Sequence, residues 1–326
     1  MLNKRLYFFC CLMLCAAHAS NTIDDHNWQQ KPQVKAFIKK QIQLGFLTQK
    51  DLLQGLSRGH IQKSIIEKIT RPYEDKPWPV YQHHFVSKQR IKLGRAYMKQ
   101  HRRALHRAQK QYAVPASVIT AVIGIESNFG KHQSNFKAID ALCTLAFFYP
   151  KRAHFFQSEL AELLRLAKQH HWPIQSIGAS YAGAMGIPQF MPSSYRRFAV
   201  SARSNQAPDL FKHSDDAILS IAHYLHAYGW QPGQAMMQFA KLSHRSQLNH
   251  QHHWPITVPV QHLKKLGVIS KHALPKTIKH VKLWRIKGFK SRNIIIGLPN
   301  FDVMLHYNRS PAYALSAALL AQKYSG

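Results

Sequence analysis

The chain has 326 residues and 45% of them are hydrophobic, which excludes a disordered chain and is enough for one large domain or two smaller ones. Lysine and arginine number 45 against 14 aspartate and glutamate, a formal net charge of +31. Such a charge favours an anionic partner: nucleic acid, anionic lipid or a carboxylate-rich cell wall.

The first residues predict a signal peptide. Met1–Arg5 is basic, Leu6–Ala17 is apolar but too short to span a membrane, and Ala17-His18-Ala19 has the small-x-small pattern of a cleavage site. We therefore expect export to the periplasm after removal of residues 1–19. Cys15 is an alternative lipid acceptor, which would make an outer-membrane lipoprotein, although Leu14 is bulky for that signal. The mature chain keeps only Cys143 and so has no internal disulfide.

The N-terminal part of the mature chain, residues 20–75, reads as a short helical region. Apolar residues at near-helical spacing from Val34 to Leu44 stop at Gly45, and further short helical stretches reach Ile69. Residues 71–79 contain three prolines and predict a linker. A second domain would then occupy residues 76–326. It opens with one long basic helix over about 87–112.

The rest of the chain is mostly helical in pattern. Pro115 is placed to begin a helix that ends at Asn128-Phe129-Gly130, and residues 139–148 are apolar on nearly every side except at Asp140 and Thr144. Further helices are expected over 153–171, over 214–228 with Ser214 as its cap, and after Pro311. Segments 256–260, 277–286 and 292–296 are β-branched and predict strands. We expect a mainly α (α+β) fold with a small β insertion around 253–300.

Glu126 is the first candidate for chemistry. It lies at the flank of the apolar stripe formed by Val118, Ala121, Val122 and Ile125, in the last turn of its helix. Desolvation and the negative end of the helix dipole both disfavour its charged form, so we expect a raised pKa suited to a general acid. A solvated glutamate at a helix end is the alternative on position alone.

Residues 180–195 are the second candidate, because small residues, aromatic rings and amides alternate there. Gln189 can hydrogen-bond hydroxyl or N-acetyl groups, while Tyr181, Phe190 and Tyr195 offer faces to sugar rings. Small residues also let a flat ligand approach the backbone. A tightly packed loop with a glycine hinge explains the composition equally well.

These segments together resemble one known family. Glu126-Ser-Asn-Phe-Gly130, Ala141–Pro150, Ser180–Tyr195, Gly297–Phe301 and Tyr307-Asn308…Tyr313 look like the membrane-bound lytic transglycosylase B family, glycoside hydrolase family 103, in the family's order. The resemblance implies a lysozyme-like catalytic domain and Glu126 as the sole catalytic acid/base. It also implies substrate-binding positions along a glycan cleft: Tyr81, Arg152, Ser180, Gln189, Phe190, Tyr224, Tyr307, Asn308 and Tyr313.

The resemblance further implies cleavage of the MurNAc-GlcNAc β-1,4 bond of peptidoglycan with formation of 1,6-anhydroMurNAc ends. One glutamate would protonate the leaving oxygen, the substrate's N-acetyl group would assist, and the 6-hydroxyl would attack without water. That accounts for the lack of a clear second carboxylate, which ordinary glycosidases carry. We expect no cofactor and a monomer.

Three departures from the family pattern stand out. Lys151 replaces an arginine, which keeps the charge but loses the planar fork. Ile187-Pro188 replaces an aromatic residue and a glycine. Residues 200–209 lack the alternating oxygen ligands of the calcium loop that some members carry, and Arg203 would repel a cation, so no calcium site is predicted there.

The remaining sequence signals are less specific. The histidine pairs and clusters have no catalytic metal spacing, so no metal site is predicted: His83-His84, His170-His171 and His250…His252-His253. Alternatives to the transglycosylase are a muramidase that admits water, a wall-binding scaffold without turnover, and a nucleic-acid-binding protein. The signal peptide and the lack of any binding motif oppose the last. The charge would instead hold the protein on anionic wall or membrane.

Overall fold

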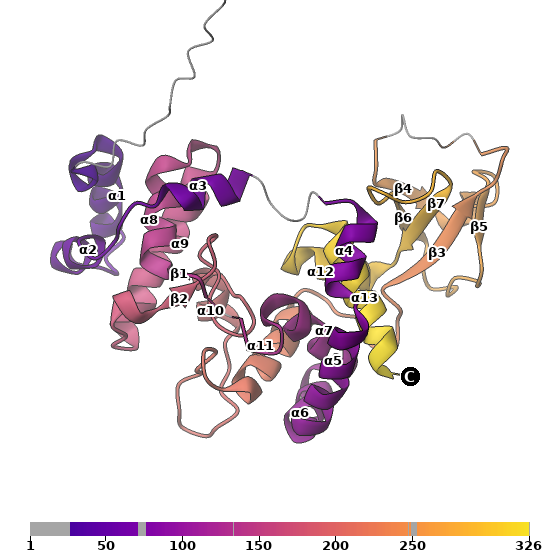
Figure 1. The fold of residues 1–326 in the computed structure, drawn as a ribbon, viewed down its shortest axis with the longest axis horizontal. Helices are drawn as coiled ribbons and strands as arrows, with labels where there is room; N and C mark the ends of the chain where they lie inside the picture. Colours follow the sequence, from indigo (N-terminus) through magenta and orange to yellow (C-terminus); the bar gives the residue numbers. More distant parts are fainter. Residues whose placement is uncertain (1–26, 71–75, 133, 247, 249–252, 326) are drawn as a thin grey trace, which may run out of the picture.

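The computed structural model describes residues 27–70, 76–132, 134–246, 248 and 253–325, and helices dominate this part of the chain (Figure 1). The predicted signal peptide, with Cys10, Cys11 and Cys15, lies outside the described residues. None of the described helices is long and apolar enough to cross a membrane.

Three short helices of the N-terminal region lie beside a helical hairpin at one side of the molecule (Figure 1). The three helices are α1 (Pro32–Gln43), α2 (Gln49–Leu56) and α3 (Lys63–Thr70), and the hairpin is α8 (Ala138–Phe148) and α9 (Ala153–Gln169). Gly45, with φ of 75°, follows the end of α1, as the sequence predicted. Thr48 and Asp51 form a reciprocal capping box that fixes the start of α2.

The two polar residues of the otherwise apolar helix α8 hold the N-terminal region in place. The Asp140 carboxylate accepts hydrogen bonds from the His60 backbone N–H (2.9 Å) and from Gln62 Nε2 (2.8 Å). The Thr144 hydroxyl accepts from the Gln62 backbone N–H at 3.0 Å. At Gly59 a Cβ would lie 2.8 Å from Cys143 Sγ, so only glycine lets the chain approach α8 this closely.

The long basic helix expected over 87–112 is wrong as one element, because it breaks at His101 into α5 (Lys88–Gln100) and α6 (Arg102–Tyr112). His101 has φ −104° and ψ 26°; its ring lies 4.3 Å from that of Tyr97, and its Nδ1 is 3.2 Å from Asp215 Oδ1. The break lets each half reach a partner of its own. Both α5 and α6 contact α7 (Ala116–Ser127), but α5 also packs on α13 (Pro311–Ser325), whereas α6 packs on α11 (Ser214–Ala227).

Two helix starts differ by one residue from the expected ones. Pro115 is the N-cap of α7 rather than its first residue, and His213 occupies the N-cap of α11, so Ser214 is the first helical residue and not a cap. Gly229, with φ of 87°, follows α11 as expected. The expected linker over 71–79 overlaps α4 (Trp78–Phe85), whose first turn contains Pro79. Two shorter helices complete the site region: α10 (Pro192–Phe198) and α12 (Pro299–Tyr307).

The sheet predicted near the C-terminus exists and is larger than expected. Its order is β4-β6-β7-β3-β5 and every neighbouring pair is antiparallel. The strands are β3 (Met237–Leu242), β4 (Ile256–Pro259), β5 (Val268–Ser270), β6 (His280–Trp284) and β7 (Asn293–Gly297). Strand β3 precedes the expected insertion at 253–300. A separate two-stranded ladder joins β1 (Phe136–Lys137) to β2 (Gly178–Ala179).

Strand β7 ties the sheet to the helices. Ile295 belongs to the core shared by the helices, whereas Ile294 and Ile296 belong to a second core formed within the sheet and its loops. Because side chains alternate across a strand, a strand buried on both faces carries an uninterrupted apolar run. Burial of β7 on both faces therefore explains the run of three isoleucines. The strand also contacts α12.

Candidate active site

Glu126 lies half-buried in the last turn of α7, at a helix end with an unusual backbone. Asn128, Phe129 and Gly130 all have left-handed backbones, with φ of 48°, 63° and 82°. The Ser127 hydroxyl accepts from the Gly130 N–H at 3.0 Å, and the Ser127 carbonyl accepts from the His132 N–H at 2.9 Å. This closed turn fixes the position from which the Glu126 side chain leaves the helix.

Three tyrosines from three further helices surround Glu126. Burial is the main reason that the pKa values of Tyr224, Tyr307 and Tyr313 are raised, and the nearby negative charge of Glu126 raises all three further. Hydrogen bonding of the Tyr313 hydroxyl to Glu126 adds to this effect. All three phenols stay protonated beside the carboxylate across the working pH range.

The tyrosines are locked to one another and to the loop before α10. Tyr224 and Tyr307 have ring centroids 4.8 Å apart, Phe190 lies 5.5 Å and 5.9 Å from them, and Tyr307 stacks on Tyr313 at 6.3 Å. The Tyr224 hydroxyl donates to the His306 carbonyl (2.7 Å), and the Tyr307 hydroxyl donates to the Pro188 carbonyl (2.6 Å). Because both hydroxyls are fixed, this aromatic wall is rigid before any ligand arrives.

The wall opens into a cleft of about 540 Å³ between α9, the loop before α10, α11 and α12. Six of the predicted substrate-binding residues line it: Arg152, Gln189, Phe190, Tyr224, Tyr307 and Asn308. Glu126 is not itself part of this lining. Because Tyr224 and Tyr307 line the cleft and the charge of Glu126 raises the pKa of both, the carboxylate lies close to this wall. A cleft lined by aromatic rings, amides and one arginine suits a sugar polymer.

The other three predicted binding residues lie around this lining. Tyr313 is buried between Tyr307 and Glu126, and Tyr81 is buried on α4, close enough to affect the ionisation of Tyr313. The Ser180 hydroxyl accepts hydrogen bonds from the Ala182 and Ala184 N–H groups at 3.3 and 3.2 Å, so it shapes its own turn.

The small residues of the 180–195 loop are required by packing. A Cβ on Gly183, where φ is 84°, would lie 2.5 Å from the Leu142 side chain. A Cβ on Gly186, where φ is 68°, would lie 2.6 Å from the Leu210 carbonyl oxygen. This favours the packed-loop interpretation for the glycines, while Gln189 and Phe190 face the cleft.

A buried carboxylate in the cleft wall, Glu159 on α9, was missed from the sequence. Its carboxylate accepts from the Ser193 N–H at 2.9 Å and from the Ser193 hydroxyl at 2.7 Å, which fixes the start of α10. Burial raises its pKa despite these two hydrogen bonds. The available signal was its position one residue before Leu160, on the apolar face of the amphipathic helix.

In the loop over residues 200–209 an arginine points inward. Arg203 Nη2 lies 3.1 Å from Asp216 Oδ2, and the Asp216 carboxylate also accepts from the Ala202 and Asp209 N–H groups at 2.8 Å each. Asp216 is fully buried, so this guanidinium supplies the positive charge that the carboxylate requires. Within the described ranges, no group of three or more histidine, cysteine, aspartate or glutamate side chains is arranged to hold a metal. Part of the His250–His253 cluster lies outside those ranges.

Comparison with known proteins gives consistent matches. A family model described as transglycosylase SLT domain matches residues 29–322. Membrane-bound lytic murein transglycosylase B of Escherichia coli K12 is 28% identical over 306 residues, covering 91% of this chain and 83% of the relative. The solved structure of the Pseudomonas aeruginosa lytic transglycosylase SltB1 is 34% identical, covers 92% of this chain and 99% of that one, and has a TM-score of 0.82.

A third relative was solved with a ligand. Pseudomonas aeruginosa SltB3, in complex with NAG-anhNAM-pentapeptide, is 28% identical with a TM-score of 0.76, over 90% of this chain and 78% of that one. The helical, lysozyme-like fold with a small sheet that the sequence predicted is confirmed by these structural matches.

Proposed function

The chain belongs to the transglycosylase SLT domain family and acts on peptidoglycan as a lytic transglycosylase; within this activity, we propose that Glu126 is the single catalytic acid/base. The observation that carries the proposal is the convergence of Tyr224, Tyr307 and Tyr313 on this one carboxylate beside the cleft wall.

The proposed reaction needs no second protein carboxylate. Glu126 protonates the glycosidic oxygen as the bond from the MurNAc anomeric carbon breaks, and the substrate's own N-acetyl oxygen stabilises that carbon. The Glu126 carboxylate then takes the proton of the MurNAc 6-hydroxyl, and the oxygen of that hydroxyl attacks the anomeric carbon. The proton balance closes, no water is consumed, and the product is a 1,6-anhydroMurNAc end. The nucleophile is intramolecular and benefits from high effective molarity.

The cleft residues take supporting roles in this proposal. Phe190, Tyr224 and Tyr307 offer ring faces to the sugars, and Gln189 and Asn308 offer amides to hydroxyl and N-acetyl groups. Arg152, held over the Phe155 ring at 4.2 Å, places a positive charge at the cleft rim, where carboxylates of the stem peptide would pass. Glu159 is engaged with Ser193 and is assigned a positioning role, because both of its oxygens are already occupied.

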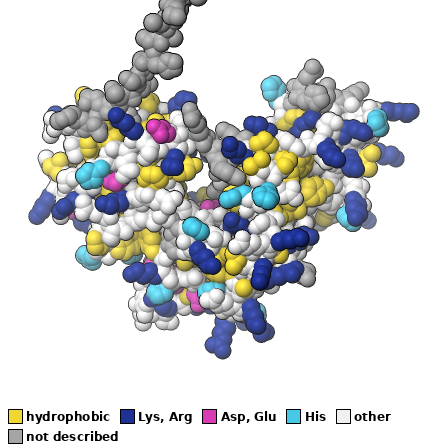
Figure 2. All heavy atoms as spheres, in the orientation of Figure 1, with side chains coloured by type: hydrophobic (Ala, Val, Ile, Leu, Met, Phe, Trp, Pro, Cys, Tyr) yellow, Lys and Arg dark blue, Asp and Glu magenta, His cyan; other side chains and the backbone are white. Residues whose placement is uncertain are grey.

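We further propose that residues 1–19 direct the protein to the periplasm and that it acts there as a monomer, without nucleic acid. Lysine and arginine are spread over the visible face of the molecule rather than gathered in one groove (Figure 2). A dispersed positive charge favours loose attraction to an extended anionic surface such as the wall or a membrane.

The decisive experiment uses purified sacculi with the mature protein, with Glu126→Gln, and with Glu67→Gln as a matched control at an exposed position on α3. Mass spectrometry should find anhydromuropeptides, one water lighter than hydrolysed products, from wild type and from the Glu67 variant but not from Glu126→Gln. Reducing-end products would instead indicate a muramidase. Binding without release of any product from wild type would indicate a scaffold and would refute the proposal.

A further inference from the structure

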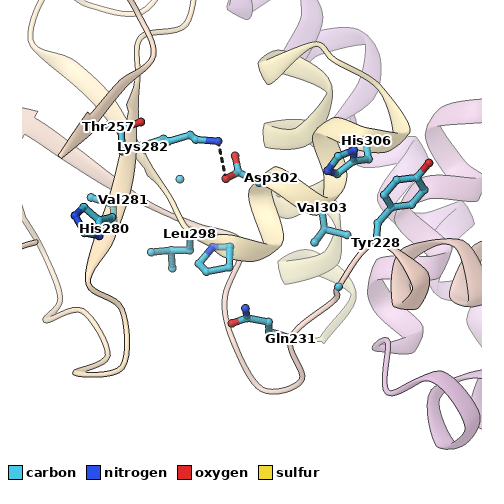
Figure 3. A pocket seen from close by; sticks show the side chains of 13 residues that line it. Tyr228, Gln231, Thr257, His280, Val281, Lys282, Leu298, Asp302, Val303 and His306 are labelled. Carbon is cyan, nitrogen blue, oxygen red and sulfur yellow. Dashed lines mark hydrogen bonds and ion pairs between the residues drawn. The ribbon is translucent and has the colours of Figure 1, made fainter. Parts of the chain in front are cut away.

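A second pocket, of about 310 Å³, lies between the sheet and α12, beside the catalytic cleft (Figure 3). Strands β4 and β6 supply Thr257, His280 and Lys282, and α12 supplies Asp302 and His306. The Lys282 side chain reaches from the strand across to the helix, where its Nζ lies 2.9 Å from Asp302 Oδ2 (Figure 3).

This pocket is separated from the catalytic cleft by a shared partition. Tyr228 and His306 line both spaces, and their rings stack at 4.6 Å with an interplanar angle of 21°. Tyr228 in turn lies 4.6 Å from Tyr224 of the aromatic wall. Only this pair of rings therefore separates the two spaces. A side branch of a polymer bound in the catalytic cleft could enter the second pocket by passing it.

Hydrogen bonds and strand pairing fix both walls of the pocket. Fully buried Asn300 holds the chain that follows α11: its Oδ1 accepts from the Gln231 N–H at 2.7 Å, and its Nδ2 donates to the Gln231 and Gln234 carbonyls at 2.8 Å each. Gln231 is thereby fixed in the pocket lining. The other wall is β6, paired with β4 and β7 in the sheet.

The charges of the pocket identify the kind of ligand. Lys282 and Asp302 are each 41% exposed, so both can exchange their mutual contact for a ligand. A purely anionic group would be repelled by Asp302, and a purely cationic one by Lys282. The pair instead complements a ligand that carries a carboxylate and an ammonium group close together. In stem-bearing strands the glycan is uncharged, because each MurNAc lactyl carboxyl is amide-linked to its stem, whereas the stem peptides carry carboxylates and, where they contain a diamino acid, an ammonium group. Stripped strands expose the lactyl carboxylates but have no ammonium group.

We propose that the second pocket binds the stem peptide of the strand whose glycan lies in the catalytic cleft, with Lys282 taking a stem carboxylate and Asp302 the stem ammonium. This inference rests on the proposed function, since it requires peptidoglycan in the cleft. It assigns to the sheet a part in substrate selection, which the sequence did not suggest.

The test compares two substrates: glycan strands with intact stems, and the same strands stripped of stems by an amidase. The variant Lys282→Met/Asp302→Leu removes both charges at similar size. Its control is Lys168→Met, which breaks a 2.6 Å ion pair with Asp51 outside the cleft and keeps the Thr48–Asp51 capping box. We expect the pocket variant to raise KM about five- to tenfold on stem-bearing strands and to leave stripped strands unaffected. The control should change neither.

A second measurement uses wild-type protein alone, so it holds even if the variant folds poorly. The free tetrapeptide L-Ala-D-Glu-diaminopimelate-D-Ala should competitively inhibit cleavage of stem-bearing strands and leave cleavage of stripped strands unchanged. Equal effects of the variant on both substrates, or no inhibition by millimolar peptide, would overturn the pocket assignment while leaving the catalytic proposal intact. Failure of wild type to cleave either substrate would overturn both.

Discussion

The ion pair between partly exposed Arg203 and buried Asp216 allows a sharp test of what holds the 200–209 loop. Replacing Arg203 with methionine leaves the fully buried Asp216 carboxylate with two backbone N–H donors but without a compensating charge. Breaking a fully buried ion pair costs about 3–5 kcal/mol, and breaking a surface pair about 0–1 kcal/mol. Because the Arg203 side chain is 35% exposed, we expect an intermediate loss of about 2 kcal/mol.

Thermal unfolding measures this loss directly. A destabilisation of about 2 kcal/mol should lower Tm by about 3 °C in a chain of this size. Arg107→Met is the matched control, because exposed Arg107 donates to the Ala202 carbonyl of the same loop (2.7 Å) without compensating a buried charge. Millimolar calcium should stabilise neither variant, since the loop lacks alternating oxygen ligands. A Tm unchanged by Arg203→Met, or calcium stabilisation of wild type, would refute this account of the loop.

Three further predictions concern Glu159, Tyr307 and the surface charge. Burial raises the pKa of Glu159 above 4.5, so the folded state favours its protonated form. The resulting stability is fully present below pH 4.5 and is lost as the pH rises through the folded-state pKa. The Tm difference between wild type and Glu159→Gln should thus fall from pH 4 to pH 7, and a rising difference would contradict the assignment. Tyr307→Phe removes the hydrogen bond to Pro188 and should lower stability by about 1 kcal/mol and raise KM, as checked by calorimetry and sacculus digestion. Retention on sacculi should fall steeply between low and moderate salt in a pelleting assay, because dispersed surface charges are screened; salt-insensitive retention would point to specific contacts.

The sequence by itself determined the elements whose signal is local. The apolar stripe of α7, the near-continuous apolar run of α8 and the three isoleucines of β7 each reflect burial along one segment, so the local apolar pattern and the β-branched residues located them. It also marked Glu126 as a carboxylate at the flank of an apolar helix, and its motifs carried the family resemblance. None of these required knowledge of what packs against the segment.

Only the tertiary structure decided the features that depend on partners distant in the sequence. The helix over 87–112 breaks at His101, where α5 turns toward α13 and α6 toward α11, and no local periodicity records these partners. Strand β3 has no β-branched residue in its Met-Gln-Phe-Ala-Lys-Leu sequence and is a strand because β5 and β7 pair with it on either side. The ring pair of Tyr228 and His306, which separates the two pockets, joins residues 78 positions apart in the chain. Their contact is a property of the packed chain and of no single segment.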